Sequence, residues 1–463
     1  MKTIRNAFAG ALVAVSLLAT AFAAEPPPPA EPRPFKLPEL TRFSLDNGLD
    51  VTLVPFGNVP KVDVHVVVRT GNVNEGEQRW LADYTAALLK EGTTLRDGSR
   101  LATDAASMGG ELMTLVTEDQ TLVIGSALAE FAPQLVGLLA EMVRTPAFAE
   151  DDAERVRADL RRQLDVELSR AQAQADEAFL RQFYGDHAYG DIYPSPEQLD
   201  ALDAAAARAF HEGNFGAART HVYVAGMFDP AATREAIEKA FAEWQAGPAP
   251  EPNPPGKLPA PQRLTLIDRP GAPQSSLVIG LPVVDPTHED YVRLQVMNAL
   301  LGGSFGSRIT SNIREDKGYT YSPYSFVRER YRHALWEQHA DVTTEHTADS
   351  VREILNEIRR LREEAPSEAE LAGIRNYLAG VFVLQASSRF GLINQLRRID
   401  LHGLPPDTLE TYAQRINAVT PEEVRGIAAR YLDPQKMALV IVGDLAKVRP
   451  QLESLEWPGE TAR

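Results

Sequence analysis

The chain has 463 residues, of which 44% are hydrophobic, so it is too long for one ordinary domain and can form two hydrophobic cores. Its net charge of -17 at pH 7 excludes the basic surface that is typical of a nucleic-acid-binding protein. It contains no cysteine, which excludes disulfides, thiolate zinc sites, cysteine nucleophiles and lipid attachment to a mature N-terminal cysteine.

Residues 1–24 have the three parts of a secretory signal peptide. Two basic residues near the start precede a mostly apolar run at residues 7–22, and Ala-Phe-Ala at residues 21–23 is a small-residue cleavage site. The apolar run is short and a Pro-rich segment follows at residues 25–40, so we expect cleavage; an uncleaved membrane anchor is the alternative. Export without cysteines predicts a bacterial periplasmic protein with no membrane span after cleavage.

A second Pro-rich segment, residues 247–262, is expected to be a stiff, extended linker. It divides the mature chain into two parts of ordinary domain size, residues 41–246 and residues 263–460. The two parts resemble each other, because a helix end, a turn, an apolar strand and a glycine recur at a constant offset, which carries Gly226 onto Gly443. This repetition favours an internal duplication.

Strands open each part of the chain. Asn47-Gly48 suits a type I′ hairpin turn, and residues 61–69 alternate polar and apolar side chains as a half-buried strand does. Residues 263–270 and 275–283 are expected strands of the second part. Amphipathic helices are expected at residues 130–145, 153–171 and 350–364. Strands grouped with helices indicate an α+β fold, with an antiparallel sheet in each domain.

Several local motifs occur together in one order: RTGNVNEGEQ, KEGT, SMGGELMTLVTEDQTLV, MVRTPAF, YGDHAYG and LLGGSFGSRITSNIREDKGYTYSPYS. With them the sequence resembles the insulinase, or pitrilysin, family of zinc peptidases, in the two-domain bacterial branch similar to mitochondrial processing peptidase. The resemblance runs from about Thr41 to Trp457. It implies two homologous α+β domains arranged as a clamshell.

In active members of that family, the helix before the KEGT-like turn carries H-x-x-E-H, in which two histidines bind zinc and the glutamate activates water. The resemblance places this motif on WLADYTAALLKEGT, with Asp83 and Ala87 at the histidine positions and Ala86 at the glutamate position. It places the distal glutamate ligand near Gln163. The resemblance therefore implies no catalytic residue and no zinc in this chain.

The motif is not displaced elsewhere, because no two of the nine histidines are four residues apart. His333 and His339 are six apart, a spacing that does not share one helix face well, and each histidine is expected to be a surface or packing residue. Asp83, Glu91 and Glu118 are a candidate set for a hard cation, with simple solvation as the alternative.

A binding role is expected at Arg314 and Tyr321, seven residues apart in IREDKGYTY. In the family, an arginine and a tyrosine at this spacing hold the substrate carbonyl, and a guanidinium and a phenol can both donate hydrogen bonds to a developing oxyanion. The alternative is that Arg314 lies on a helix surface and Tyr321 in a strand of the core. The glycine-rich run at residues 302–306 lacks a nucleotide-binding context and is either a substrate-contacting loop or a packing turn.

Two hypotheses for the function follow. The first is an exported, non-catalytic subunit that shapes a chamber and binds peptide for a zinc-bearing paralogue, which would hold the zinc and carry out hydrolysis in a heterodimer. The second is a stand-alone peptide-binding or envelope assembly protein on the same fold. A metallopeptidase acting by itself would need a site that the sequence does not show.

Overall fold

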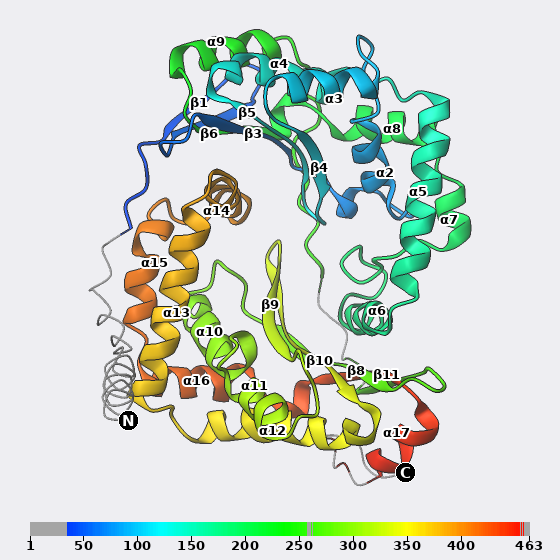
Figure 1. Ribbon diagram of the computed structural model, residues 1–463, viewed down its shortest axis with the longest axis vertical. Coiled ribbons are helices and arrows are strands. Elements are labelled where there is room, and N and C mark those ends of the chain that lie inside the picture. The colour runs from blue at the N-terminus through cyan, green and yellow to red at the C-terminus, as the bar shows by residue number, and fades with distance from the viewer. Residues whose placement is uncertain (1–34, 257–260, 262, 454, 456, 458–463) are drawn as a thin grey trace, which may run out of the picture. The chain divides into compact units, whose positions relative to one another are not determined.

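Two mixed β-sheets with helices packed on them make up the computed structural model in Figure 1, which describes residues 35–463 without 257–260, 262, 454, 456 and 458–463. Residues 35–463 form one compact unit. The expected signal peptide, residues 1–24, and residues 25–34 of the first Pro-rich segment lie outside the described residues. In the part of the chain that the structure describes, no helix combines the length and apolar character that a membrane crossing needs.

The first sheet has the strand order β1-β2-β6-β3-β5-β4, and the second has the order β7-β11-β8-β10-β9. Neighbouring strands are antiparallel, as expected, except that β2 runs parallel to β6 and β7 parallel to β11. The bounds are Thr41–Ser44 (β1), Asp50–Pro55 (β2), Lys61–Val68 (β3), Leu112–Val116 (β4), Thr121–Leu128 (β5), Thr220–Gly226 (β6), Leu264–Asp268 (β7), Gln274–Val283 (β8), Tyr324–Arg330 (β9), His333–Thr343 (β10) and Ala438–Gly443 (β11).

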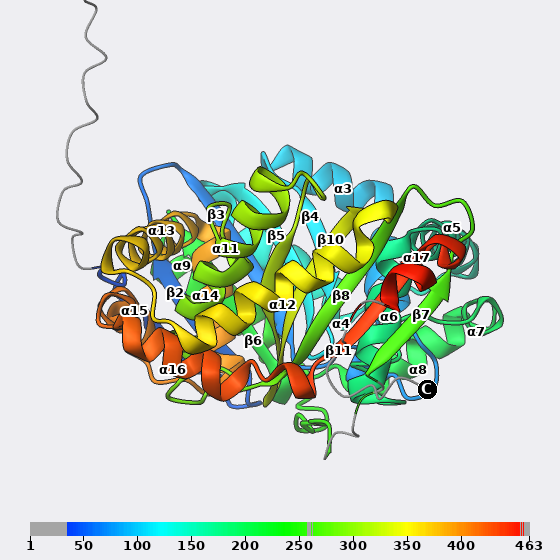
Figure 2. The ribbon, with the colours of Figure 1, turned by 90° about the horizontal axis from the view of Figure 1, so that it is seen from below.

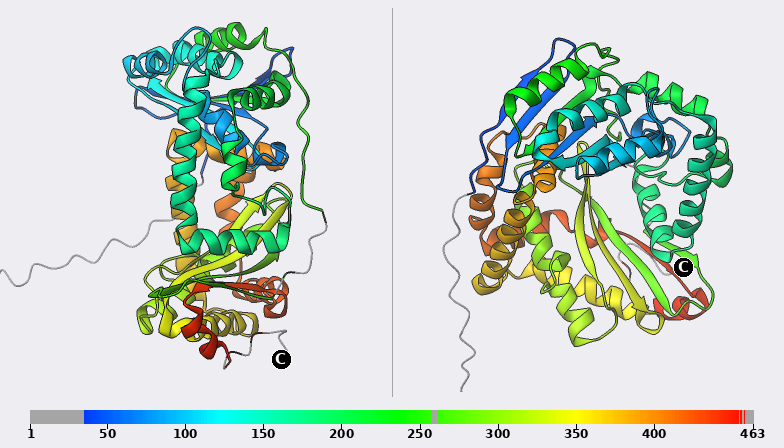
Figure 3. Two further views of the ribbon diagram at one scale, coloured as in Figure 1. Left: turned by 90° about the vertical axis from the view of Figure 1, so that its right-hand side faces the viewer. Right: turned by 45° about the horizontal axis from the view of Figure 1, so that its top comes forward.

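Helices cover the sheets: α4 packs on β3 and β5 with α9 beside it, and α12 packs on β10 with α16 beside it (Figures 2 and 3). The three expected helices are present as α4, α5 and α12. The helix bounds are Leu81–Leu88 (α2), Gly98–Ser107 (α3), Ala132–Arg144 (α4), Glu150–Leu168 (α5), Ala171–Tyr184 (α6), Pro196–Asp200 (α7), Ala204–Asn214 (α8), Pro230–Phe241 (α9), Tyr291–Asn298 (α10), Arg308–Thr310 (α11), Thr347–Glu363 (α12), Glu368–Ala386 (α13), Arg389–His402 (α14), Thr408–Asn417 (α15), Pro421–Tyr431 (α16) and Leu445–Leu452 (α17).

The hairpin expected at Asn47-Gly48 joins β1 to β2, but its turn is longer than the two-residue type I′ turn. The turn runs from Leu45 to Leu49, and Gly48 takes a positive φ of 87° while Asn47 does not. The Asn47 side-chain amide instead donates to the backbone carbonyls of Phe241 (2.8 Å) and Trp244 (2.9 Å). The type I′ prediction is wrong because this asparagine fixes the end of α9.

Strand β3 is buried on both faces, whereas the alternation of its sequence suggested a half-buried strand. Val62, Val64 and Val66 face the main core of the first sheet. His65 and Val67 are also buried, because helix α14 from the second part of the chain packs on β3. A single sequence pattern does not reveal this second layer.

The two sheets repeat one topology. β2, β6, β3, β5 and β4 occupy the same order in the first sheet as β7, β11, β8, β10 and β9 in the second. The 3₁₀ turns Ala217–Arg219 and Pro434–Lys436, just before β6 and β11, keep the offset that relates Gly226 to Gly443. The repetition of topology supports an internal duplication, and the exact domain boundaries stay a prediction.

Helices α6 and α14 each pack on the sheet of the other part of the chain. Their starts are as far apart along the chain as the starts of β6 and β11, as expected of equivalent helices in a duplication. α14 contacts β3 and β6, where Leu396 and Tyr223 share one apolar cluster. α6 contacts β8 and β11, where Phe179 and Val440 share another. The two parts therefore share two apolar clusters, while each keeps a main core of its own.

Candidate functional site

Helix α2 is the helix on which the resemblance placed the zinc motif, and a buried carboxyl caps its start. Trp80 precedes the helix in a left-handed conformation (φ 64°). The Glu75 carboxyl accepts hydrogen bonds from the backbone N–H groups of Trp80 and Ala82, each at 3.1 Å. Burial raises the pKa of Glu75 to about 8, against the opposing effect of these hydrogen bonds. Glu75 is not among the residues predicted from the sequence, although a carboxyl before a helix start is a capping signal.

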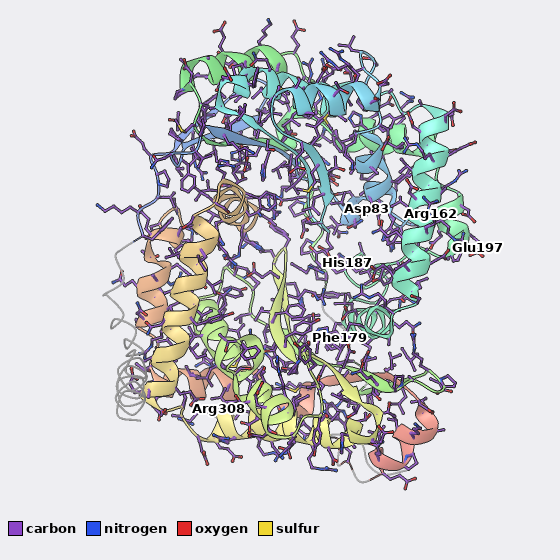
Figure 4. The ribbon with its side chains drawn as sticks, viewed as in Figure 1. Asp83, Arg162, Phe179, His187, Glu197 and Arg308 are labelled. Carbon is purple, nitrogen blue, oxygen red and sulfur yellow. The ribbon has the colours of Figure 1, made fainter. Side chains whose placement is uncertain are left out.

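Asp83 lies in the first turn of α2, at the position of the first histidine (Figure 4). Its carboxylate accepts a hydrogen bond from the side-chain amide of Asn72 at 2.7 Å. The same amide donates to Glu75 at 3.2 Å. Burial raises the pKa of Asp83 to about 6; the Asn72 hydrogen bond lowers it and the charge of Glu118 raises it. Two carboxyls whose pKa values are raised by burial therefore share one amide.

The other positions of the motif offer no metal ligands. Ala86 is buried in α2, and Ala87 packs against the core of the first sheet. Gln163 is exposed on α5. α5 lies beside α2, as the hydrogen bond from the Tyr84 hydroxyl to the Ala153 carbonyl (2.9 Å) shows. The face of α2 is thus kept as a packing surface.

Asp83, Glu91 and Glu118 do not form the hard-cation site that we considered. Within the described residues they are not among the groups of acidic and histidine side chains close enough to share an ion. Each has a separate partner: Asn72 for Asp83, Arg155 for Glu91 at 2.5 Å, and Arg330 for Glu118 at 2.6 Å.

The one such group among the described residues consists of Asp176, Glu337 and His339. It joins α6 to β10, since the His339 ring nitrogens lie 3.4 Å from Asp176 and 2.9 Å from Glu337. The Arg328 guanidinium also pairs with both Glu337 oxygens, at 2.5 and 2.7 Å. Burial would raise the pKa of Glu337, but Arg328 outweighs it and lowers the pKa to about 2. Because a cation already neutralises Glu337, the group is an ion-pair network that ties α6 to the second sheet.

The structure brings Arg314 and Tyr321 together. The Arg314 guanidinium lies 4.6 Å from the centre of the Tyr321 ring and 4.5 Å from that of Phe305. Tyr321 is 76% exposed and Phe305 68% exposed, so the alternative of Tyr321 as a core strand residue is wrong. Arg314 lies in a π-helical turn, Ser311–Asp316, a conformation frequent at functional sites. Sequence reasoning missed Phe305, which belongs to the glycine-rich run.

The repeated sheet topology and the helices packed on both sheets define a protein of mixed α and β structure made of two similar parts. The sequence profile described as "Insulinase (Peptidase family M16)" matches residues 56–196, and the one described as "Peptidase M16 inactive domain" matches residues 201–378. The chain belongs to the insulinase family, peptidase family M16.

Its relatives cover nearly the whole chain. It is 26% identical over 419 residues to an uncharacterised zinc protease of Mycobacterium tuberculosis. This alignment covers 89% of this chain and 95% of that protein. It is 23% identical over 428 residues to the β subunit of the rat mitochondrial processing peptidase, covering 89% and 86%.

Solved structures show the same fold. A peptidase M16 inactive domain from Pseudomonas fluorescens has a TM-score of 0.80 at 22% identity and covers 87% of this chain and 98% of its own. A protease from Helicobacter pylori has a TM-score of 0.81 at 18% identity and covers 88% and 100%. At these identities the likeness concerns the fold.

Proposed function

We propose that this chain is an exported, non-catalytic subunit of a zinc metallopeptidase of the insulinase family. The observation that carries the proposal is helix α2. The helix is intact, capped by Glu75 and packed against α5. It nevertheless carries Asp83, Ala86 and Ala87 at the positions where zinc-dependent hydrolysis needs two histidines and a glutamate. In this proposal the chain keeps the helix but not the side chains that bind zinc and activate water, so hydrolysis is assigned to a zinc-bearing paralogue.

The contribution of this chain to the partner's reaction is peptide binding. Arg314 and the exposed Tyr321 supply a guanidinium and a phenol, which can donate to the oxygen of a scissile carbonyl as charge develops on it. Strand β4 ends the first sheet, so no strand among the described residues pairs with one of its edges, and an extended peptide can add there. Met113 and Leu115 on β4 are 41% and 42% exposed and offer apolar contacts to such a peptide.

A stand-alone peptide-binding or envelope assembly protein is the second candidate. The free strand edge of β4 and the exposed Tyr321 favour it equally, because binding an extended peptide at either needs no zinc-bearing partner. Such a protein would bind peptide but would not change the activity of any zinc peptidase.

The test is zinc content and peptide hydrolysis of the purified mature chain, alone and mixed with the product of a neighbouring gene that encodes H-x-x-E-H. The proposal expects no zinc and no cleavage by the chain alone, and more cleavage in the mixture than the partner gives by itself. Arg314→Ala should remove this gain. Arg352→Ala, on the outer α12, serves as the control and should keep it. Stoichiometric zinc with cleavage by the isolated chain would refute the proposal.

A further inference from the structure

A cavity of about 360 Å³ lies beside strand β9, the edge strand of the second sheet. Helices α10, α13, α14 and α15 form its other walls (Figure 1). Its volume is within the range of about 300–1,000 Å³ that small-molecule sites have. Apolar side chains line it together with four amide side chains, those of Gln295, Asn298, Gln385 and Gln395. Apolar walls with a few polar groups are typical of a ligand site.

The internal duplication relates this cavity to the zinc-motif region of the first half. Helix α2 follows β3, and α10 follows β8, the strands that pair with β6 and β11. Residues 87–89 and residues 299–301 both read Ala-Leu-Leu, which aligns the two helices. The alignment matches three buried residues of the first half with three buried residues of the second: Ala82, Tyr84 and Leu88 with Leu294, Val296 and Leu300.

All four positions of the motif have counterparts in the wall of the cavity. Helix α13 corresponds to α5, because both have 19 residues and their starts are as far apart along the chain as those of α6 and α14. Val381 therefore stands at the position of Gln163. The counterparts of Asp83, Ala86 and Ala87 on α2 are Gln295, Asn298 and Ala299, and these three line the cavity with Val381.

The charges in the cavity wall cancel each other. The Glu329 carboxylate accepts hydrogen bonds from the Arg398 guanidinium at 2.6 and 2.9 Å. Burial would raise the pKa of Glu329, but Arg398 outweighs it and lowers the pKa. An anionic ligand would meet the charge of Glu329 and a cationic ligand that of Arg398, and either would lose its hydration on entry. The cavity therefore suits a neutral ligand.

The amide side chains leave both a donor and an acceptor for such a ligand. Gln395 donates to the side-chain oxygen of Gln385 at 3.2 Å. Among the described residues, nothing accepts from the Gln385 amide nitrogen or donates to the Gln395 side-chain oxygen, and Arg398 Nη1 is also without an acceptor. A hydroxyl group both donates and accepts, so it matches this set of groups.

The edge of β9 does not favour an extended peptide at this place. The Asn298 side-chain amide donates to the backbone carbonyl of Ser325 at 3.3 Å, and the Arg330 side chain donates to that of Glu329 at 3.1 Å. The π-helical turn Ala299–Gly303 also packs against the strand. Because side chains already occupy these backbone acceptors, a peptide cannot pair along β9 as it can along a free edge. The hydrogen bonds to a ligand come from side chains, which fits a compact molecule.

We propose that this cavity binds a neutral sugar. The hydroxyl groups of the sugar pair with the Gln385 and Gln395 amides, and the apolar face of its ring lies against the aromatic side chains of the wall, such as Phe326 and Phe382. This inference goes beyond the proposed function and does not rest on it, since the cavity lies in the second half of a single chain and needs neither a zinc-bearing partner nor a peptide.

Isothermal titration calorimetry of the purified mature chain tests the proposal, with glucose, N-acetylglucosamine, maltose and diacetylchitobiose as probes. At least one of these neutral sugars is expected to bind at one site per chain. The double variant Gln385→Met with Gln395→Met removes both amides, so it should weaken binding by about 10-fold or more. Methionine favours a helix as well as glutamine does, so the thermal unfolding midpoint of the variant should stay close to that of the wild type.

A matched variant supplies the control. Gln163→Met removes an amide at the first-half counterpart of Val381 and should leave sugar binding unchanged. Failure of all four sugars to bind would overturn the proposal, as would binding that survives the double variant or that Gln163→Met weakens equally. An unstructured peptide that binds in place of the sugars, and that the double variant no longer binds, would assign the cavity to peptides and overturn it too. The hydrolysis test in the mixture is a separate measurement, so failure of either inference is seen on its own.

Discussion

The side-chain amide of Asn72 donates a hydrogen bond to the Asp83 carboxylate at 2.7 Å and a second one to Glu75 at 3.2 Å. This amide thus occupies the region where the resemblance placed a zinc site, and it serves two acids whose pKa values are both raised by burial. The Glu75 carboxyl in turn accepts hydrogen bonds from the backbone at the start of the helix. Because both pKa values are raised, we expect the free energy of unfolding to depend on pH through these two carboxyls.

Glu75→Gln should flatten the dependence of stability on pH. Burial raises the pKa of Glu75 from 4.5 in the unfolded chain to about 8, so between these values the folded chain holds a proton that the unfolded chain has lost. The free energy of unfolding of the wild type should therefore fall as pH rises through this window, by up to about 1.4 kcal/mol per pH unit from this group. Urea unfolding at pH 5, 6, 7 and 8 measures the slope. Equal slopes in wild type and variant would contradict the assignment.

Restoring the ligands should restore zinc binding. Asp83→His and Ala87→His put two imidazoles one helical turn apart, and Gln163→Glu supplies a carboxylate from the neighbouring α5. The triple variant is expected to bind about one zinc per chain and to gain thermal stability when zinc is added, whereas the wild type is expected to do neither. The matched control keeps Gln163 and should bind zinc more weakly. If the triple variant takes up no zinc, the placement of the motif on α2 or of the third ligand on α5 is wrong.

Tyr321→Phe should distinguish the role of the Tyr321 ring from the role of its hydroxyl. The phenylalanine ring keeps the contact with the Arg314 guanidinium, which lies 4.6 Å from the ring centre. If the hydroxyl donates to the oxyanion, its loss should lower kcat in the mixture with the zinc-bearing partner by about 10- to 100-fold and leave KM nearly unchanged. Steady-state kinetics on a fluorogenic peptide measures both constants. A change in KM alone would assign Tyr321 to ground-state binding.

Phe305→Ala should weaken peptide binding and leave folding unchanged. The Phe305 ring is 68% exposed and lies against the Arg314 guanidinium, so its removal leaves no cavity in the core. We expect KM in the mixture to rise several-fold because the ring is an apolar contact for the peptide. The exposed Leu95→Ala serves as the control and should not change KM, since Leu95 lines a pocket with α4 and α9, on the face of the first sheet opposite to α14. An unchanged KM for Phe305→Ala would assign the ring to positioning Arg314 only.

Arg328→Met should destabilise the packing of α6 on the second sheet. Glu337 is fully buried, and Arg328 supplies its main charge compensation through two hydrogen bonds. Removing one partner of a buried pair leaves an uncompensated charge, which costs about 3–5 kcal/mol. The double variant Arg328→Met with Glu337→Gln should recover part of this loss, as urea denaturation will measure. If the single variant is as stable as the wild type, the network does not hold α6 in place.

Local chemistry in the sequence was enough for many features. The strand at residues 61–69, the helices at 130–145 and 350–364 and the recurrence of Gly226 at Gly443 are all found in the structure. These features depend on periodicity and on neighbouring residues, which the sequence contains in full. The prediction that Asp83 and Ala87 stand where active members carry histidines also needed only the sequence and a resemblance.

Tertiary structure alone decided which distant residues meet. No local pattern indicates that α6 and α14 cover each other's sheets, that Asn72 joins Asp83 to Glu75, or that Phe305 lies against Arg314. The type I′ turn failed for the same reason, because Asn47 is held by the carbonyls of Phe241 and Trp244, which are distant in the chain. Burial and hydrogen-bond partners are properties of the folded chain, so the sequence determined the elements and their chemistry while the packing determined the site.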